Sequence, residues 1–291
     1  PPAATPRLNR APYCQARAEE TSVVDAVTPQ GRVCDQDLAP RPIDAPDFSA
    51  LFNYGYHLDA GKFAGLLQRH CTQRLGVNHV LDHVTAVNGA TDGDIDSIST
   101  AKHGKIPGDL FIDCTGLKAL LLNGHYGIDF VDCRDVLFND SALAVQVPYR
   151  SVTDPVASQT ISTAQEAGWA WDIGLSSRRG VGYTWSSAHA DDEAAHRVLE
   201  TYVAATAAVP WDELNPRKID FRPGHREKFW HRNSVAIGMS AGFLEPLEAS
   251  ALVLIELAGR MIAEELPATR ATMDTVANRF NQTFRYRWER I

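Results

Sequence analysis

Residues 233–266 read NSVAIGMSAGFLEPLEASALVLIELAGRMIAEEL. An apolar strand over Val235–Ile237 is predicted to end at Gly238, and a loop then leads to a helix that begins near Glu248. A strand that passes through a glycine loop into a helix is typical of proteins in which strands and helices alternate. The stretch therefore predicts an α/β or α+β fold.

The start of this predicted helix has the chemistry of a binding site. The first N–H groups of a helix have no intrahelical partner and lie at the positive end of the dipole, so the amides of Ser250 and Ala251 can hold an anion or a cofactor carbonyl oxygen. Glu245 and Glu248 flank the site and can serve as a base or a charge stabiliser. The alternative is that Glu248 only caps its helix, and this stretch taken alone favours that alternative.

A second strand ends in the same manner. Residues 109–116 read DLFIDCTG, in which an apolar strand over Leu110–Cys114 reaches Gly116. Glycine allows the backbone to turn sharply or to approach a ligand closely, and ligands of open α/β sheets bind beyond the carboxyl ends of strands. A ligand-binding strand end and a core strand with a tight turn are equally compatible with these residues.

The stretch GWAWDIGL, residues 168–175, carries a Trp-x-Trp pair. In a strand, alternate side chains point to opposite faces, so one face carries Trp169, Trp171 and Ile173 and the other Ala170, Asp172 and Gly174. A ladder of core aromatics is the ordinary interpretation of such a pair. The alternative is the wall of a pocket.

The rest of the chain supplies further elements. Helices are predicted from Asp59 to about Leu75, over the stretch DDEAAHRVLETYVAAT, and over about 248–266 and 269–291. A strand is predicted where Tyr54, Tyr56 and Leu58 alternate, and a hairpin turn at Ser176–Arg179. The basic stretch RPGHREKFWHR (222–232) is predicted to be a solvated hairpin. Half of the prolines lie in residues 1–50, which are predicted to be irregular.

Composition excludes several classes of function. The 291 residues carry a formal net charge of −8, which argues against nucleic acid as a partner. No apolar run approaches the roughly 18–20 residues of a membrane span, and the first residues have no apolar core of a signal peptide, so a cytoplasmic protein is expected. The five cysteines form no CxxC pair, and His79 and His83 lack a third ligand, so no metal site is predicted.

Five stretches together resemble the flavin-dependent halogenases of the tryptophan halogenase family. They occur in the same order as in that family, over residues 50–290: NYGYHLDAGKFAGLL, GVNHVLDHV, DLFIDCTGLKALLL, GWAWDIGL with RRGVGYTWSS, and SVAIGMSAGFLEPLEAS. The Trp-x-Trp-x-Ile stretch distinguishes this family from flavin monooxygenases of the same fold. The family's signature usually continues with Pro where this chain has Gly174, and Glu-Ser-Thr-Gly is here Glu248-Ala249-Ser250-Ala251.

The resemblance implies an FAD/NAD(P)-binding fold like that of p-hydroxybenzoate hydroxylase. It implies a partial FAD-binding halogenase domain over 51–291, with an added substrate-side β-sheet at about 142–232 and closing helices at 248–291. The family's GxGxxG segment is absent from this sequence, and the chain is expected to be a fragment. A homodimer is compatible with the resemblance.

The resemblance also implies a reaction. A separate flavin reductase supplies FADH2, and a flavin C4a-hydroperoxide oxidises halide to hypohalous acid. That oxidant then halogenates an electron-rich aromatic such as an indole or phenol, guided by a lysine that is assigned to no lysine of this chain. The substrate, its regiochemistry and the choice of chloride or bromide stay open. An FAD-dependent aromatic monooxygenase and an inactive fragment are the alternatives.

Residue by residue, the resemblance assigns three groups of positions. Glu248 matches the active-site glutamate that helps to remove the ring proton, and Trp169 and Trp171 match the pair that keeps substrate off the flavin. The backbone amides of Ser250 and Ala251 match the halide site. The flavin-contacting positions are matched by Val84, Asp113, Gly116, Gly238, Met239 and Leu252.

Overall fold

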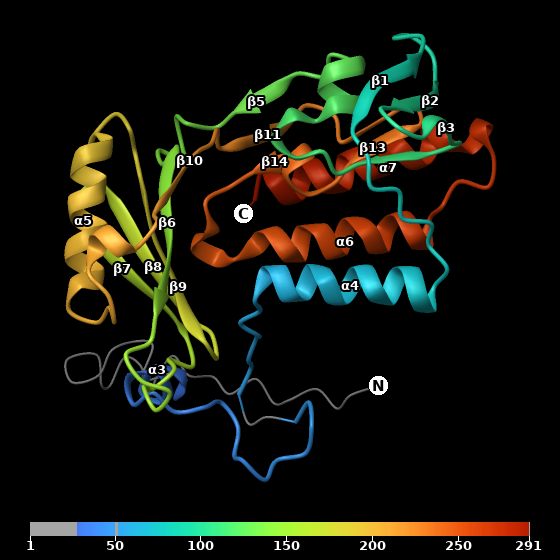
Figure 1. Cartoon of the computed structure of the whole chain (residues 1–291). Coiled ribbons are helices and arrows are strands. Elements are labelled where there is room, and N and C mark those ends of the chain that lie inside the picture. Colours follow the sequence, from blue (N-terminus) through green and yellow to red (C-terminus); the bar gives the residue numbers. More distant parts are fainter. Residues whose placement is uncertain (1–27, 50–51, 291) are drawn as a thin grey trace, which may run out of the picture.

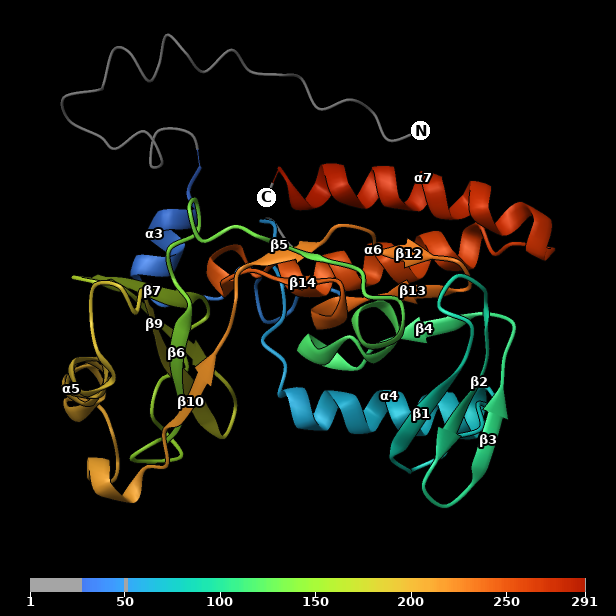
Figure 2. The ribbon, with the colours of Figure 1, turned by 90° about the horizontal axis from the view of Figure 1, so that it is seen from above.

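The computed structural model describes residues 28–49 and 52–290 of the chain. The chain forms two parts that lie side by side: a five-stranded sheet covered by helix α5, and a set of small sheets with the helices α4, α6 and α7 (Figures 1 and 2). The mixed α/β fold expected from the alternation of strands and helices is confirmed.

The five-stranded sheet is antiparallel throughout, in the order β10-β6-β9-β8-β7. Helix α5 (Asp192–Ala204), capped by the Asp191 side chain, covers one face, where Leu199 and Val203 pack against Val145 and Val181 of the sheet. The predicted hairpin turn joins two of its strands, as expected. The strands are β6 (Ser141–Pro148), β7 (Thr160–Gln165), β8 (Gly168–Gly174), β9 (Arg178–Trp185) and β10 (Arg217–Asp220).

The second part centres on two parallel strands. Strand β4 (Phe111–Asp113) pairs with β13 (Ser234–Ala236), and β12 (Trp230–His231) joins the far edge of β13. Helices α6 (Ser250–Glu264) and α7 (Arg270–Trp288) form one core with these strands. Their buried side chains recur at the helical period that the sequence predicts: Leu254, Ala258, Ile262, Met273, Ala277, Phe280, Phe284 and Trp288.

The remaining elements surround these two parts. Helix α4 (Ala60–Arg74) begins as predicted at Asp59, whose Oδ1 accepts from the Lys62 N–H at 3.1 Å. The other elements are β1 (Val84–Gly89), β2 (Ile95–Thr100) and β3 (Gly104–Pro107) in one sheet; β5 (Phe130–Asp132), β11 (Gly224–Arg226) and β14 (Gly242–Phe243) in another; and the short helices α3 (Gln30–Asp35), η1 (Gly116–Lys118), η2 (Leu120–His125), η3 (Trp211–Glu213), η4 (Gly238–Ser240) and η5 (Pro246–Glu248).

Two of the expectations for local structure are wrong. Residues 53–58 are extended but pair with no strand among the described residues; Tyr54 and Tyr56 pack edge to face on each other instead, with ring centroids 5.6 Å apart. The basic stretch 222–232 is not a solvated hairpin. Strands β10 and β11 belong to different sheets, and Arg226 and Trp230 are buried, because this segment crosses between the two parts of the molecule.

The first fifty residues are described only in part. Residues 1–27 and 50 lie outside the described residues, so most of the predicted irregular segment does too. Over 28–49 the chain has one six-residue helix, α3, among turns. In the described part of the chain, no helix combines the length and the apolar composition needed to cross a membrane.

Strand β12 carries a partly buried histidine, His231, that should make stability depend on pH. Burial lowers the pKa of His231 from its ordinary value of 6.5, and the cations Lys228 and Arg232 lower it further. The unfolded chain therefore binds this proton more readily than the folded chain. The stabilising contribution of neutral His231 is present above pH 6.5 and is lost as the pH falls.

We therefore expect the free energy of unfolding to drop between pH 7 and pH 5, and the drop to be smaller in H231Q. Urea denaturation at both pH values measures this difference. His70, exposed on α4 and without a side-chain hydrogen bond or ion pair among the described residues, provides the control variant H70Q. An equal drop in wild type and H231Q would contradict the assignment.

Candidate functional site

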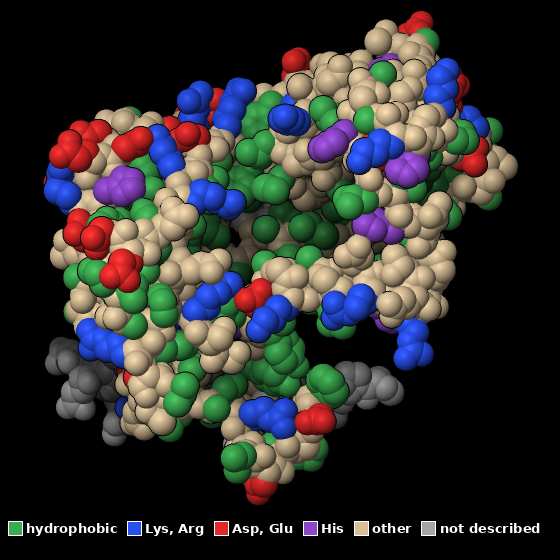
Figure 3. Space-filling model, in the orientation of Figure 1, with side chains coloured by type: hydrophobic (Ala, Val, Ile, Leu, Met, Phe, Trp, Pro, Cys, Tyr) green, Lys and Arg blue, Asp and Glu red, His purple; other side chains and the backbone are tan. Residues whose placement is uncertain are grey.

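An apolar pocket lies between the end of β13 and the start of α6. Its volume is about 320 Å³. Figure 3 shows hydrophobic side chains gathered in a hollow between the five-stranded sheet and the helices. Among the residues that line the pocket are Ile237, Gly238, Met239, Phe243, Leu244, Glu245, Pro246, Ala249, Ser250, Ala251, Leu252 and Ile255. Five of the positions assigned by resemblance thus lie on one cavity: Gly238, Met239, Ser250, Ala251 and Leu252.

The two predicted strand ends meet beside this pocket. Strands β4 and β13 are parallel neighbours, so their carboxyl ends lie at the same edge, and the Ile237 N–H donates to the Asp113 carbonyl at 3.1 Å. Gly238 then turns with φ +64°, a conformation that favours glycine. The Ser240 hydroxyl donates to the Gly116 carbonyl at 3.1 Å, which joins the loops that follow the two strands.

The Asp113 carboxylate holds the first of these loops. Its side chain is buried; Oδ1 accepts from the Thr115 N–H at 3.0 Å and from the Thr115 hydroxyl at 2.6 Å. Its Oδ2 accepts from the N–H groups of Leu121 and Leu122, at 2.9 and 3.1 Å. Asp113 therefore satisfies the amides at the start of η2, and it does not line the pocket itself.

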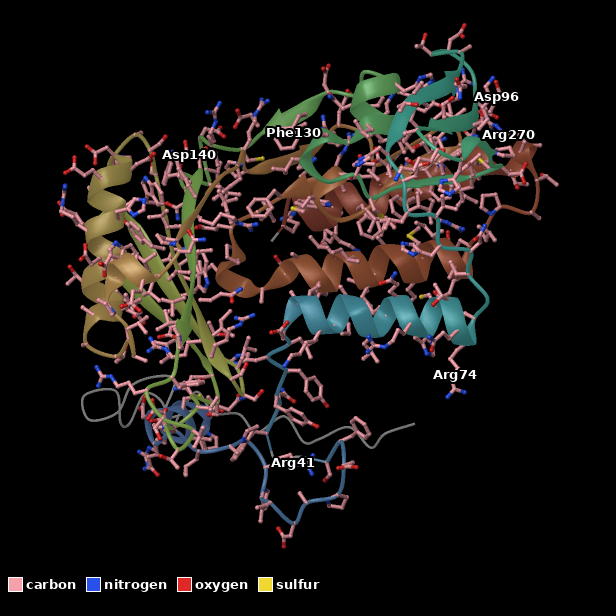
Figure 4. All side chains as sticks on the ribbon, viewed as in Figure 1. Arg41, Arg74, Asp96, Phe130, Asp140 and Arg270 are labelled. Carbon is pink, nitrogen blue, oxygen red and sulfur yellow. The ribbon has the colours of Figure 1, made fainter. Side chains whose placement is uncertain are left out.

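Arg226 is a residue of this region that the sequence interpretation missed. Its guanidinium is buried and donates to the carbonyl of Leu117 at 3.3 Å and to that of Ser240 at 3.4 Å, so it bridges the two loops. It also stands over the Phe130 ring at 5.3 Å, on β5 (Figure 4). Burial lowers the pKa of Arg226, while Asp113 raises it. The local excess of basic residues hid this role, because most such arginines are solvated.

The helix start has the expected backbone geometry. Residues 246–248 form the 3₁₀ turn η5, Ala249 adopts a left-handed conformation with φ 50°, and α6 begins at Ser250. No side chain among the described residues caps the first turn of α6. The first amides of this fifteen-residue helix therefore have no side-chain partner among the described residues, and Ser250 and Ala251, which carry two of them, line the pocket. The Glu248 side chain lies outside what the structure describes, so its predicted role is not tested by it.

The two tryptophans lie on the sheet face that α5 does not cover. Trp169 pairs across the ladder with Thr184, and Trp171 with Gly182, while the alternate residues of β9 face α5. The predicted alternation is therefore confirmed. The two rings are 6.0 Å apart, and the Trp169 indole N–H donates to Glu245 Oε2 at 2.9 Å. Trp169 thus reaches a residue that lines the pocket.

Small side chains make room for this pair. Register places Ala144, Gly182 and Ser162 in one row with Trp171, and Ala142, Thr184 and Ala164 in one row with Trp169. A Cβ atom built on Gly182 would lie 2.0 Å from the Trp171 ring, so the indole rests directly on the glycine backbone. The positions of the Trp169 and Trp171 rings, which we call the wall, are therefore set by strand β9 as well as by β8.

Not all assigned residues come together. Val84 begins strand β1 in the three-stranded sheet, is partly exposed, and does not line the pocket. Neither Trp169 nor Trp171 is among the residues that line the pocket, and Trp171 lines a separate cavity with Ala144 and Arg217. Gly116 does not line the pocket either, and its carbonyl is bonded to Ser240 on the loop that follows β13. Their assignments remain predictions. Gly174, at the end of β8, is fixed by His57, whose Nδ1 lies 3.0 Å from the glycine carbonyl oxygen.

Comparison with known proteins identifies the family of this chain. The family model for tryptophan halogenases matches residues 11–291. The chain is 38% identical to the 7-chloro-L-tryptophan 6-halogenase of Kutzneria sp. (strain 744) over 245 residues, which cover 82% of this chain and 46% of that protein. It is 40% identical to the tryptophan 6-halogenase of Streptomyces toxytricini over 217 residues, which cover 75% and 40% of the two chains.

Solved structures show the same fold. A tryptophan halogenase from Shewanella frigidimarina NCIMB 400 superposes with a TM-score of 0.91 at 47% identity, covering 97% of this chain and 54% of that one. A flavin-dependent halogenase from Brevundimonas sp. BAL3 superposes with a TM-score of 0.84 at 32% identity, covering 97% and 56%. The chain spans about half the length of these relatives. Its fold is the FAD-binding fold expected from the resemblance, and the chain belongs to the tryptophan halogenase family.

Proposed function

We propose that the protein is an FADH2-dependent halogenase that oxidises halide and halogenates an electron-rich aromatic such as an indole or phenol. The observation that supports this proposal most directly is the meeting of two features at one pocket. These are the helix start at Ser250, which no side chain among the described residues caps, and the Trp169 indole, which is bonded to the pocket residue Glu245. A reductase that supplies reduced flavin would be its partner.

The residues at the pocket fit a flavin ring. Gly238, Met239 and Leu252 offer an apolar surface, and the exposed Met239 and Leu252 side chains have room for a flat aromatic group. Reduced flavin, when bound, supplies the electrons and activates oxygen. We assign Asp113 and Gly116 to the neighbouring loop that supports the ring, and Val84 to the adenine end.

Residues of this chain would direct the oxidation to halide and away from the aromatic substrate. The amides of Ser250 and Ala251 would bind halide at the positive end of α6. Trp169 and Trp171 would keep the aromatic substrate from the flavin, and Glu248 would accept the proton from the ring carbon that takes the halogen. These roles require that bulk water is excluded from the pocket, and the apolar lining of the pocket favours such exclusion.

The proposal is tested by incubating the protein with FAD, a flavin reductase, NADH, oxygen and either chloride or bromide. A panel of indoles and phenols serves as substrate, and mass spectrometry detects the halogen isotope pattern. We expect a halogenated product that requires both halide and reductase. A preparation that retains FAD but halogenates no member of the panel would contradict the proposal, and a hydroxylated product formed without halide would establish the monooxygenase alternative.

A further inference from the structure

Three segments of the chain meet at the carboxylate of Glu245. This residue stands between β14 and η5, on the loop that leads into α6. Its Oε2 accepts from the Trp169 indole N–H of β8 at 2.9 Å, and the same oxygen accepts from the side-chain amide of Asn139. Asn139 precedes β6 and is followed by Asp140, which Figure 4 labels at the end of the five-stranded sheet. One oxygen atom therefore ties the loop to strand β8 and to the segment that leads into β6.

The place of Glu245 in the chain suggests a different and simpler role, which the structure excludes. Glu245 occupies the cap position of η5, where a carboxylate ordinarily accepts from the first amides of the turn. Its side chain makes no such bond. The carboxylate points across the pocket rim to the sheet instead, so its interactions belong to the wall and not to the turn.

The contact is a strong constraint on Trp169. Trp169 is 9% exposed, and the only polar atom of its side chain donates to a carboxylate oxygen. Hydrogen bonds to an ionised acceptor are roughly twice as strong as neutral ones. Rotation of the indole about its side-chain bonds would break this bond and leave a buried N–H without a partner. A shift of the Glu245 loop that leaves Trp169 in place would break this bond.

We propose that Glu245 is a positioning residue that fixes the Trp169 indole and thereby sets the separation between the wall and the start of α6. This inference rests on the proposed function, because its consequence is expressed in how oxidation is directed. Glu245 itself does not need to touch a reacting atom. It links the loop that carries Glu248, Ser250 and Ala251 to the strand that carries the tryptophans.

The contact is tested on the 291-residue chain by its indole N–H signals in ¹⁵N NMR. The W169F variant identifies the Trp169 signal among those of the six tryptophans. We expect E245L to move this signal and to speed its exchange with solvent, and E245Q, which retains an acceptor oxygen, to restore it. E200L, on the exposed side of α5, removes the same charge far from the pocket and should leave the signal in place. A Trp169 signal that is unchanged in E245L would overturn the inference.

The functional consequence is tested by the yield of halogenated product per reduced flavin consumed. We expect this yield to fall about tenfold in E245L, with KM for the aromatic and FAD binding near the wild-type values, and to recover in E245Q to within about twofold. An E245L variant with a displaced indole but a wild-type yield would overturn the role of Glu245 in directing oxidation. If the wild-type protein yields no product, the proposed function fails, while the NMR signals still decide whether Glu245 positions Trp169.

Discussion

The variant G182A should lose about 3 kcal/mol of the free energy of unfolding, and the Trp171 indole should leave its place on the sheet. The added methyl group would lie 2.0 Å from the Trp171 ring and 2.5 Å from the Leu143 carbonyl oxygen. The ring can move, but the Leu143 backbone belongs to the neighbouring strand β6 and cannot retreat without breaking the ladder. Overpacking of this kind typically costs about 1–3 kcal/mol, and two simultaneous clashes place G182A at the upper end.

Gly180 provides a matched control on the same strand and the same face. A Cβ atom there meets nothing closer than the end of the Arg178 side chain, at 3.9 Å. G180A should therefore change the free energy of unfolding by less than about 0.5 kcal/mol. Urea denaturation measures both values, and the exciton signal of the Trp169–Trp171 pair in the circular dichroism spectrum reports the ring geometry. Equal stabilities for G180A and G182A, with the exciton signal retained, would show that the indole does not rest on Gly182.

The second large effect is expected from D113N. The Asp113 carboxylate accepts four hydrogen bonds, two at each oxygen, from Thr115, Leu121 and Leu122. An asparagine has only one acceptor oxygen, so its NH2 group must face at least one backbone N–H that then has no acceptor. A buried donor without a partner costs about 1–3 kcal/mol, and the loss of the ionised acceptor adds to this. We expect D113N to lower the free energy of unfolding by roughly 2–4 kcal/mol.

The change in D113N should also be local. Hydrogen exchange should quicken first at the three backbone amides that donate to Asp113, those of Thr115, Leu121 and Leu122, since the substitution removes one acceptor oxygen and the charge of the other. D109N, on the exposed approach to the same strand, gives the control and should behave as the wild type. If D113N matched D109N in stability and in exchange, the carboxylate would not be what holds the start of η2.

The sequence predicts the main helices and the two glycine-terminated strands because their signals are local. Asp59 directly precedes α4 and caps its first turn. Helix α7 buries side chains such as Phe280 and Phe284 at the helical period. The assigned positions Gly238, Met239, Ser250, Ala251 and Leu252 reach one pocket because they lie within fifteen residues of one another.

What the sequence does not reveal depends on contacts between distant segments. Glu245 meets Trp169 across 76 residues of sequence, and Arg226 meets Leu117 across 109 residues. No local pattern distinguishes Arg226 from a solvated arginine, and the alternation of Tyr54 and Tyr56 resembles a strand although no strand pairs with it. In each case the structure of a residue depends on which distant segment packs against it. The tertiary structure determines that packing, and the local sequence does not show it.

The parallel pairing of β4 with β13 has a consequence for how the chain acquires its fold. The whole five-stranded sheet and α5 are inserted between these two strands, which join Ile112 to Val235. Loops of this length close slowly, whereas antiparallel hairpins such as β8–β9 form between near neighbours. During synthesis the sheet can therefore assemble first as a local unit, and the pocket forms only after the ribosome has released the residues of α6.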